Sequence, residues 1–352
     1  MHPSFRSFMF GLIDYAGLFP PAALSLEPAL EEYARLRTDE DSWMLGRFVV
    51  NSAQLAAVAG RADLLPKGHP VAFAVLGRGG DGPGPFLEGF TIDLEEISRF
   101  RKQLGGGVTV DQFEVKMPAR LLDSSDGEAT SMFFDDVARW ADAEGPPELT
   151  PFFEAPAGGD RRARWSFLID SIAAHNARRS APGVEGGGRR LCPAGIKLRC
   201  GGADARAFPS VEEVAFVLAR CAERKVAFKA TAGLHHPVRY EDAVLRTKVH
   251  GFINVFGAAH LAFARGLGEK ALRPILEEED LGKFGFDARR FVWNGTEVSF
   301  EEIESLRHAF VTSFGSCSFA EPLADLRACG WLERRSLDLA ETTIPEQPRP
   351  RK

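Results

Sequence analysis

Short apolar runs recur along this chain, and most of them are followed by a longer stretch whose apolar positions have helical spacing. Eight runs are strand candidates, at residues 11–15, 46–52, 70–76, 113–117, 149–154, 195–199, 226–230 and 251–256. Helical stretches between and after them include residues 210–224, 239–247 and 258–266. Strands that alternate with helices indicate a parallel sheet, and eight of them can close a (β/α)₈ TIM barrel. We expect such a barrel over residues 8–267, with a doubly wound open sheet as the alternative.

The pattern changes after residue 267. An Asn-Gly pair at 294–295 lies between apolar positions and predicts a β-hairpin, and a helix is expected over residues 300–312. Residues 268–333 are therefore predicted to form a C-terminal α+β extension packed on the barrel. Residues 340–352 contain three prolines and end in basic residues, which predicts a disordered tail.

Polar side chains interrupt several of the apolar strands at positions that point inward. Side chains alternate along a strand, so Ile196 and Leu198 facing the helices turn Lys197 and Arg199 into the barrel. The same reasoning places further polar residues inside, namely Glu114, Lys116, Glu154, Lys229 and Asn254. Active sites of this fold lie at the carboxyl ends of the strands, where Asp14, His235 and His236 add to the set. A site is expected there.

The two inward lysines suggest a chemistry. A buried ammonium is costly, and a neighbouring cation makes it lose its proton more easily, which produces a nucleophilic amine. One lysine of the pair is therefore expected to act as a nucleophile, with the other lowering its pKa and Glu154 or Asp14 moving protons. A structural alternative is a buried salt-bridge network in which acidic side chains neutralise the lysines.

Residues 194–262 resemble the last three strands of class I deoxyribose-phosphate aldolases. Lys-Leu-Arg-Cys-Gly at 197–201 matches the Lys-x-x-x-Gly setting of the family's Schiff-base lysine, and Lys-Ala-Thr-Ala-Gly at 229–233 matches its second lysine. Phe-Gly-Ala-Ala at 256–259 is similar to the phosphate-binding end of its last strand. The resemblance implies an aldolase-like carbon–carbon lyase with a Schiff base on Lys197. Its substrate, a small anionic molecule with a carbonyl or phosphate group, would be bound by Arg199, Lys116, Asn254, Gly233, Gly257, His235 and His236.

The sequence departs from the family in three places. Leu-Arg-Cys replaces the hydroxyl-rich run after the Schiff-base lysine, and His-His-Pro at 235–237 has no family counterpart. The fourth predicted strand carries Glu114 and Lys116 where the family has an aspartate in a different setting. The phrases at residues 14–21 and 229–237 also resemble a group of bacterial proteins without an assigned activity.

Two other function classes remain open. Adjacent His235 and His236 could bind a divalent metal together with Glu154 or Asp14, which would suit a lyase, isomerase or hydrolase. The barrel could instead bind a metabolite without catalysis. No organic cofactor is expected.

The composition argues against some classes of binding partner and indicates the cellular compartment. Lys and Arg number 43 and Asp and Glu 49, so the net charge of −6 argues against nucleic acid. Five scattered cysteines without a CxxC pair are typical of a reducing compartment, and no apolar run is long enough for a membrane span. We expect a cytoplasmic protein, and the Phe-rich extension is compatible with a homodimer.

Overall fold

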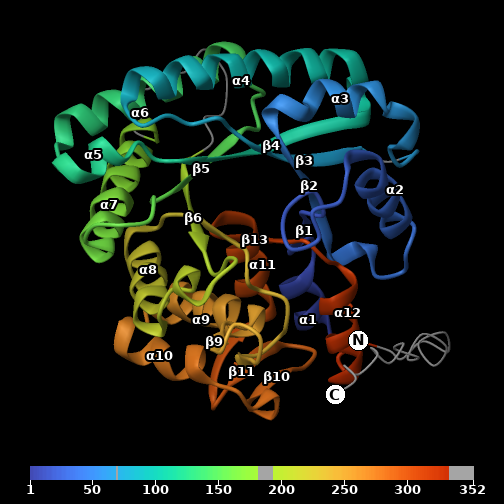
Figure 1. Cartoon of the computed structure of the whole chain (residues 1–352). Helices are drawn as coiled ribbons and strands as arrows, with labels where there is room; N and C mark the ends of the chain where they lie inside the picture. The colour runs from blue at the N-terminus through green and yellow to red at the C-terminus, as the bar shows by residue number, and fades with distance from the viewer. Residues whose placement is uncertain (69, 181–192, 333–352) are drawn as a thin grey trace, which may run out of the picture.

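Eight parallel strands close into a barrel in the computed structural model, which describes residues 1–68, 70–180 and 193–332 (Figure 1). Around the barrel the strands are β1 (Ile13–Tyr15), β2 (Leu45–Asn51), β3 (Val71–Leu76), β4 (Val108–Lys116), β5 (Thr150–Glu154), β6 (Gly195–Arg199), β7 (Phe228–Thr231) and β13 (Val311–Ser316). β13 pairs with both β7 and β1 and closes the ring. The predicted (β/α)₈ barrel is confirmed, and the open sheet is excluded.

A ring of helices covers the outside of the strands (Figure 1). They are α2 (Leu26–Arg37), α3 (Leu55–Gly60), α4 (Pro83–Leu104), α5 (Ala119–Ser124), α6 (Gly127–Glu144), α7 (Arg161–Arg179) and α8 (Val211–Arg224). α8 begins with the predicted capping box, in which Ser210 and Glu213 each accept a backbone N–H of the other. Apolar side chains between helices and strands form one continuous core.

The eighth barrel strand is not the one that the sequence predicted. Residues 251–256 lie at the start of helix α9 (Phe252–Arg265), in which nearly every residue is buried. A fully apolar run cannot be assigned to strand or helix by periodicity, and this one is apolar all round because α8, α10 and α11 enclose it. The true eighth strand, β13, was missed because its inward positions hold the small residues Ser313 and Gly315.

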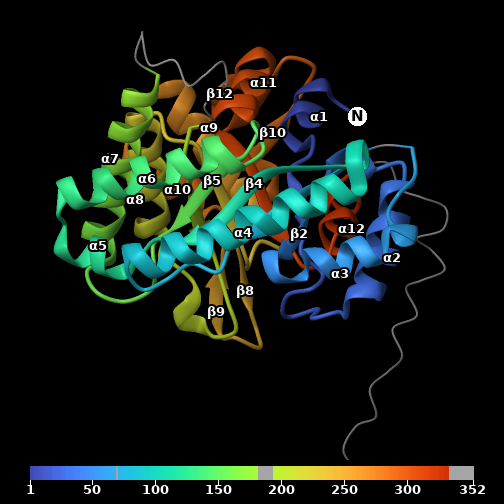
Figure 2. The same ribbon diagram turned by 90° about the horizontal axis from the view of Figure 1, so that it is seen from above.

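The predicted C-terminal extension is therefore mostly an insertion between the seventh and eighth strands, and the barrel runs past residue 267 to β13. The insertion contains the hairpin β8 (Tyr240–Asp242) and β9 (Thr247–Val249), then α9, α10 (Glu269–Glu277), a sheet of β10 (Phe284–Phe286), β11 (Arg290–Trp293) and β12 (Thr296–Ser299), and α11 (Phe300–Ala309). The Asn-Gly hairpin is confirmed in β11 and β12. The helix predicted over residues 239–247 is wrong, because the β8–β9 hairpin occupies it and projects from the body (Figure 2).

The amino-terminal helix and the three-stranded sheet pack together through aromatic rings. Phe8 of α1 (Pro3–Met9) contacts Phe286 and Phe291, with ring centroids 5.3 and 5.4 Å away. After β13 the chain forms α12 (Ala320–Ala328). Within the described residues, no helix has both the length and the apolarity to cross a membrane. The predicted tail at 340–352 lies outside the described residues.

Candidate active site

Lys197 lies inside the barrel between two carboxylates. Its Nζ is 2.9 Å from Glu114 Oε2 on β4 and 3.3 Å from Glu154 Oε2 on β5, and only 5 % of the residue is exposed. Alternation along β6 produces this orientation, because Ile196 and Leu198 on the other face pack into the core. The amine is thus buried but fully paired.

Lys229 lies deeper and is completely buried. It pairs with Lys197 in the register of β6 and β7, and its Nζ donates to Asp14 Oδ2 at 3.0 Å, to Gln112 Oε1 at 2.6 Å and to Glu114 Oε1. Glu114 therefore uses one oxygen for each lysine. A single carboxylate joins the two amines.

These contacts decide the protonation of the cluster. Burial alone lowers the pKa of Lys197, but the attraction of Glu114 and Glu154 outweighs it, and the pKa is raised. Burial raises the pKa of Glu114, yet Lys229 and Lys197 outweigh it and bring it to about 2. The expectation that Lys229 lowers the pKa of Lys197 is wrong for the resting protein, because two carboxylates contact the amine directly.

A series of contacting charged side chains, which become more exposed from Lys229 to Arg199, links this cluster to the surface. At the end of β6 the Arg199 side chain is 45 % exposed, and its Nε donates to Glu154 Oε1 at 2.9 Å. Glu154 contacts Lys197, which shares Glu114 with the fully buried Lys229. Of the two lysines, Lys197 is therefore the one that contacts the carboxylate bound by the exposed Arg199. Lys116 ends β4 opposite Glu154 in the strand register and is exposed.

Asp14 belongs to the buried end of the cluster. It accepts hydrogen bonds from Ser313 Oγ at 2.6 Å, from Arg47 N at 2.9 Å and from Lys229. Its carboxylate is completely buried, and its Oδ2 lies 3.0 Å from Lys229 Nζ. The geometry fits a counter-ion for Lys229 better than the predicted proton carrier.

Gly233 lies just beyond β7, close to the end of β6. Its φ of +71° is a conformation that residues with a Cβ rarely adopt, and a Cβ there would approach Cys200 O and Gly201 Cα to 2.8 Å. The residue lets the backbones after β6 and β7 approach closely beside the mouth. Its predicted contact with substrate stays a prediction.

Asn254 and Gly257 do not belong to this site, which corrects the sequence prediction. Both lie on α9, outside the barrel. Asn254 Nδ2 donates to Ile275 O at 2.7 Å, and its Oδ1 accepts from Arg239 N at 2.8 Å, which fixes the loop before α9. A Cβ on Gly257 would lie 2.7 Å from the ring of Phe291, so this glycine allows close packing.

The two histidines tie the loop after β7 to α12 instead of pointing at the lysines. His235 Nδ1 is 3.0 Å from Glu321 Oε2, and His236 Nδ1 is 2.5 Å from Asp325 Oδ2. Each histidine therefore meets its own carboxylate on α12. The predicted substrate contacts of the pair have no support in this arrangement.

This link predicts a pH-dependent contribution to stability. The hydrogen bond to Asp325 raises the pKa of His236 above its usual 6.5, so the stabilisation is complete below pH 6.5 and is lost as pH rises through the folded-state value. Asp325→Asn should therefore lower the melting temperature more at pH 6 than at pH 8.5. Asp81→Asn, at an exposed loop position, is the control. An equal loss at both pH values would contradict the assignment.

The metal set considered from the sequence is not assembled. His235 and His236 contact α12, whereas Glu154 and Asp14 contact Lys197 and Lys229 inside the barrel. Across residues 1–68, 70–180 and 193–332, no three His, Cys, Asp or Glu side chains are placed to hold a metal ion together. The donor set therefore does not fit the proposed metal centre.

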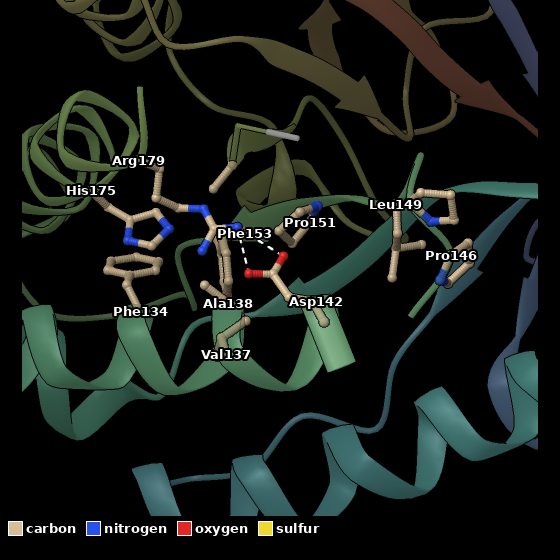
Figure 3. A pocket seen from close by; sticks show the side chains of 13 residues that line it. Phe134, Val137, Ala138, Asp142, Pro146, Leu149, Pro151, Phe153, His175 and Arg179 are labelled. Carbon is tan, nitrogen blue, oxygen red and sulfur yellow. Dashed lines mark hydrogen bonds and ion pairs between the residues drawn. The ribbon is translucent and has the colours of Figure 1, made fainter. Parts of the chain in front are cut away.

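A separate small cavity lies between α6, α7 and the amino-terminal end of β5 (Figure 3). Its volume is about 30 Å³, room for about one water molecule. Arg179 and Asp142 form an ion pair at its edge, and the His175 ring packs beside Phe134 with centroids 5.4 Å apart. Neither lysine lines it, so it is distinct from the candidate site.

Three residues of the cluster escaped the sequence prediction. Gln112 shares the inward face of β4 with Glu114, but the predicted strand began one residue too late to include it. Ser313 lies on the missed strand β13. Arg47 is inside the predicted second strand, where alternation could have identified it, and it also pairs with Asp111 Oδ2 at 2.6 Å.

No family model matches the chain, and neither does any curated protein. Among solved structures it is similar to "QR15, an Aldolase" at 14 % identity over 63 % of this chain and 80 % of that one, with a TM-score of 0.40. It is also similar to two structures of a "putative deoxyribose-phosphate aldolase" from Toxoplasma gondii ME49. The apo-form has 12 % identity, coverage of 93 % and 97 %, and a TM-score of 0.45; the other has 11 %, 93 % and 95 %, and 0.43. Similarity at this level carries no argument about activity.

Proposed function

We propose that the protein is an aldolase-like carbon–carbon lyase that works through a Schiff base on Lys197. The observation that carries the proposal is the placement of this amine. It contacts Glu114 and Glu154, and Glu154 also pairs with the exposed Arg199. Lys229 is the less suitable nucleophile because it is fully enclosed by three acceptors. Inward charges of this kind are unusual in a barrel interior, which is normally filled by Val, Ile and Leu.

The chemistry begins with a proton transfer. The Lys197 ammonium gives a proton to Glu154, and the neutral amine adds to the substrate carbonyl to form a carbinolamine. Glu154 then returns this proton to the carbinolamine hydroxyl, which leaves as water. An iminium ion on Lys197 and an ionised Glu154 remain for the next step. The raised pKa of Lys197 makes the first proton transfer a costly one.

The iminium then serves as the electron sink for bond cleavage. The substrate carries a hydroxyl group on the second carbon from the iminium carbon, and this hydroxyl loses its proton to Glu154. The bond between the hydroxyl-bearing carbon and the carbon next to the iminium carbon then breaks. The electron pair of that bond forms an enamine on Lys197, and an aldehyde leaves. Protonation of the enamine and hydrolysis return the ketone and the lysine. Lys229 takes no part in these steps and stays paired with Glu114 and Asp14.

The proposal predicts a split effect for Glu154→Gln. Removing this carboxylate removes one of the two attractions that raise the pKa of Lys197, so adduct formation should move to lower pH. Carbon–carbon cleavage should nevertheless fall by about 10²–10⁴-fold, because the proton acceptor is lost. The measurement compares cyanoborohydride trapping and aldehyde release between pH 6 and pH 9.

The control is Glu279→Gln, which removes an exposed carboxylate that pairs with Lys248. It should change neither the trapping profile nor aldehyde release. If Glu154→Gln lowered trapping and cleavage together without moving the pH profile, Glu154 would not be the group that controls the Lys197 proton. A purely structural salt-bridge network would give no adduct in any variant.

A further inference from the structure

The guanidinium of Arg199 has an open edge at the mouth of the barrel. Its Nε donates to Glu154 Oε1 at 2.9 Å, and within the described residues its two Nη groups make no hydrogen bond or ion pair. A guanidinium presents its N–H groups in a planar fork that matches a carboxylate with two parallel hydrogen bonds. The fork is the most exposed part of the charged chain that leads to Lys197.

The charged groups that lead to Lys197, taken together with Lys116, carry an excess of positive charge. Inside the barrel Asp14, Glu114 and Glu154 balance the charges of Lys229, Lys197 and Arg199. Lys116 adds one more cation beside Glu154, and its side chain likewise has no ion-pair partner in the described part of the chain. The protein as a whole carries a charge of −6, so this local sign is opposite to the global one. A single negative charge on the substrate would complete the balance.

The same contacts limit the size of the ligand. Lys197 Nζ and Arg199 Nε reach the two oxygens of one carboxylate, Glu154, at 3.3 and 2.9 Å. A molecule that touches both the amine and the guanidinium therefore needs only a few bonds between its carbonyl carbon and its anionic group. Lys197 and Arg199 are two residues apart on one face of β6, and Arg199 is the one at the carboxyl end of the strand.

The helices after β6 and β7 make a phosphate the poorer candidate. Phosphate groups are commonly held by free backbone N–H groups at a helix N-terminus. At α8 the capping box uses the N–H groups of Ser210 and Glu213, and it places the Glu213 carboxylate at this helix end. At α9 the N–H groups of Phe252 and Ile253 donate to His236 O and Pro237 O, at 3.0 and 2.9 Å.

We infer that the substrate is a short carbonyl compound with a carboxylate a few bonds from its carbonyl, and that the Nη fork of Arg199 binds this carboxylate. The inference rests on the proposed Schiff-base function and adds the substrate class. A carboxylate bound beside Glu154 has a second effect. It repels the Glu154 charge, which makes Glu154 a better acceptor for the Lys197 proton when substrate is present.

Calorimetric titration with oxamate tests the anion site without any covalent step, because the oxamate amide forms no Schiff base. Oxamate should bind the intact chain at least about tenfold more tightly than its neutral analogue oxamide, and more tightly than inorganic phosphate. Arg199→Gln should weaken oxamate binding by about 10- to 100-fold and leave oxamide unchanged. Arg99→Gln, at an exposed arginine on the outer helix α4, should bind oxamate like the wild type.

Equal binding of oxamate and oxamide, tighter binding of phosphate, or an unchanged affinity in Arg199→Gln would overturn the inference. Trapping with pyruvate and with acetone separates this result from the parent proposal. Adducts on Lys197 that form equally well with both ketones would keep the Schiff base and remove the carboxylate site. Oxamate binding through Arg199 without any trapped adduct would keep the anion site and remove the Schiff base.

Discussion

Lys197→Met should abolish the trapped adduct and lower carbon–carbon cleavage by about 10³-fold or more, because the variant loses the amine that contacts Glu154 inside the barrel. The fold should survive the change. Glu114 keeps Lys229 as a partner, and Glu154 keeps Arg199. The measurement pairs aldehyde release with a thermal unfolding scan, so that lost activity is separated from lost structure.

Lys248→Met is the matched control, since Lys248 lies on the surface and pairs only with Glu279. It should retain both the adduct and the cleavage rate. Full activity in a folded Lys197→Met protein would remove Lys197 from the reaction, and the barrel interior would then be a structural salt-bridge network or a binding site.

Lys229→Met should have the largest effect on stability, with a loss of about 3–5 kcal/mol in the free energy of unfolding. Three buried oxygens lose a donor at once, on Asp14, Gln112 and Glu114. The carboxylates of Asp14 and Glu114 stay buried, and each loses one of its positive partners. Urea unfolding at neutral pH measures the loss, and a loss below about 1 kcal/mol would show that the ammonium is not a required counter-ion.

Two comparisons identify the cause of that loss. Adding Glu114→Gln to Lys229→Met removes a buried negative charge that has lost its Lys229 partner and should restore part of the stability. The pKa of Glu114 is lowered from 4.5 to about 2, so its pairing stabilises the fold above pH 4.5 and stops doing so as pH falls through about 2. The difference between wild type and Lys229→Met should therefore be smaller at pH 3 than at pH 7.

The sequence predicted the barrel and most of its interior because alternation on a buried strand is a strong constraint. Ile196 and Leu198 have to face the core, and this alone turns Lys197 and Arg199 inward. The same reasoning gave a wrong result for Phe252–Arg265, because apolar residues cover every face there. The sequence then shows no hydrophobic periodicity that distinguishes a helix from a strand. Asn254 and Gly257 were assigned to the site through this one error.

The electrostatics of the site could not be predicted from residue types alone. The lysine pair suggested a lowered pKa because only its two charges were considered. In the folded chain, Glu114 places one oxygen on each amine and Glu154 adds another contact to Lys197, so opposite charges dominate. Ser313 and Asp14 belong to the same network only because β13 closes the barrel beside β1. Such partners depend on the register and order of the strands.

Peptide mapping of the wild-type protein after incubation with pyruvate and cyanoborohydride tests the central claim most directly. The account predicts one modified site in the peptide that contains Lys197, with Lys229 and the surface lysines unmodified at short times. An adduct on Lys229 would transfer the role of nucleophile to the deeper amine. The absence of any adduct, also with other oxo acids and with sugar phosphates, would contradict the Schiff-base function.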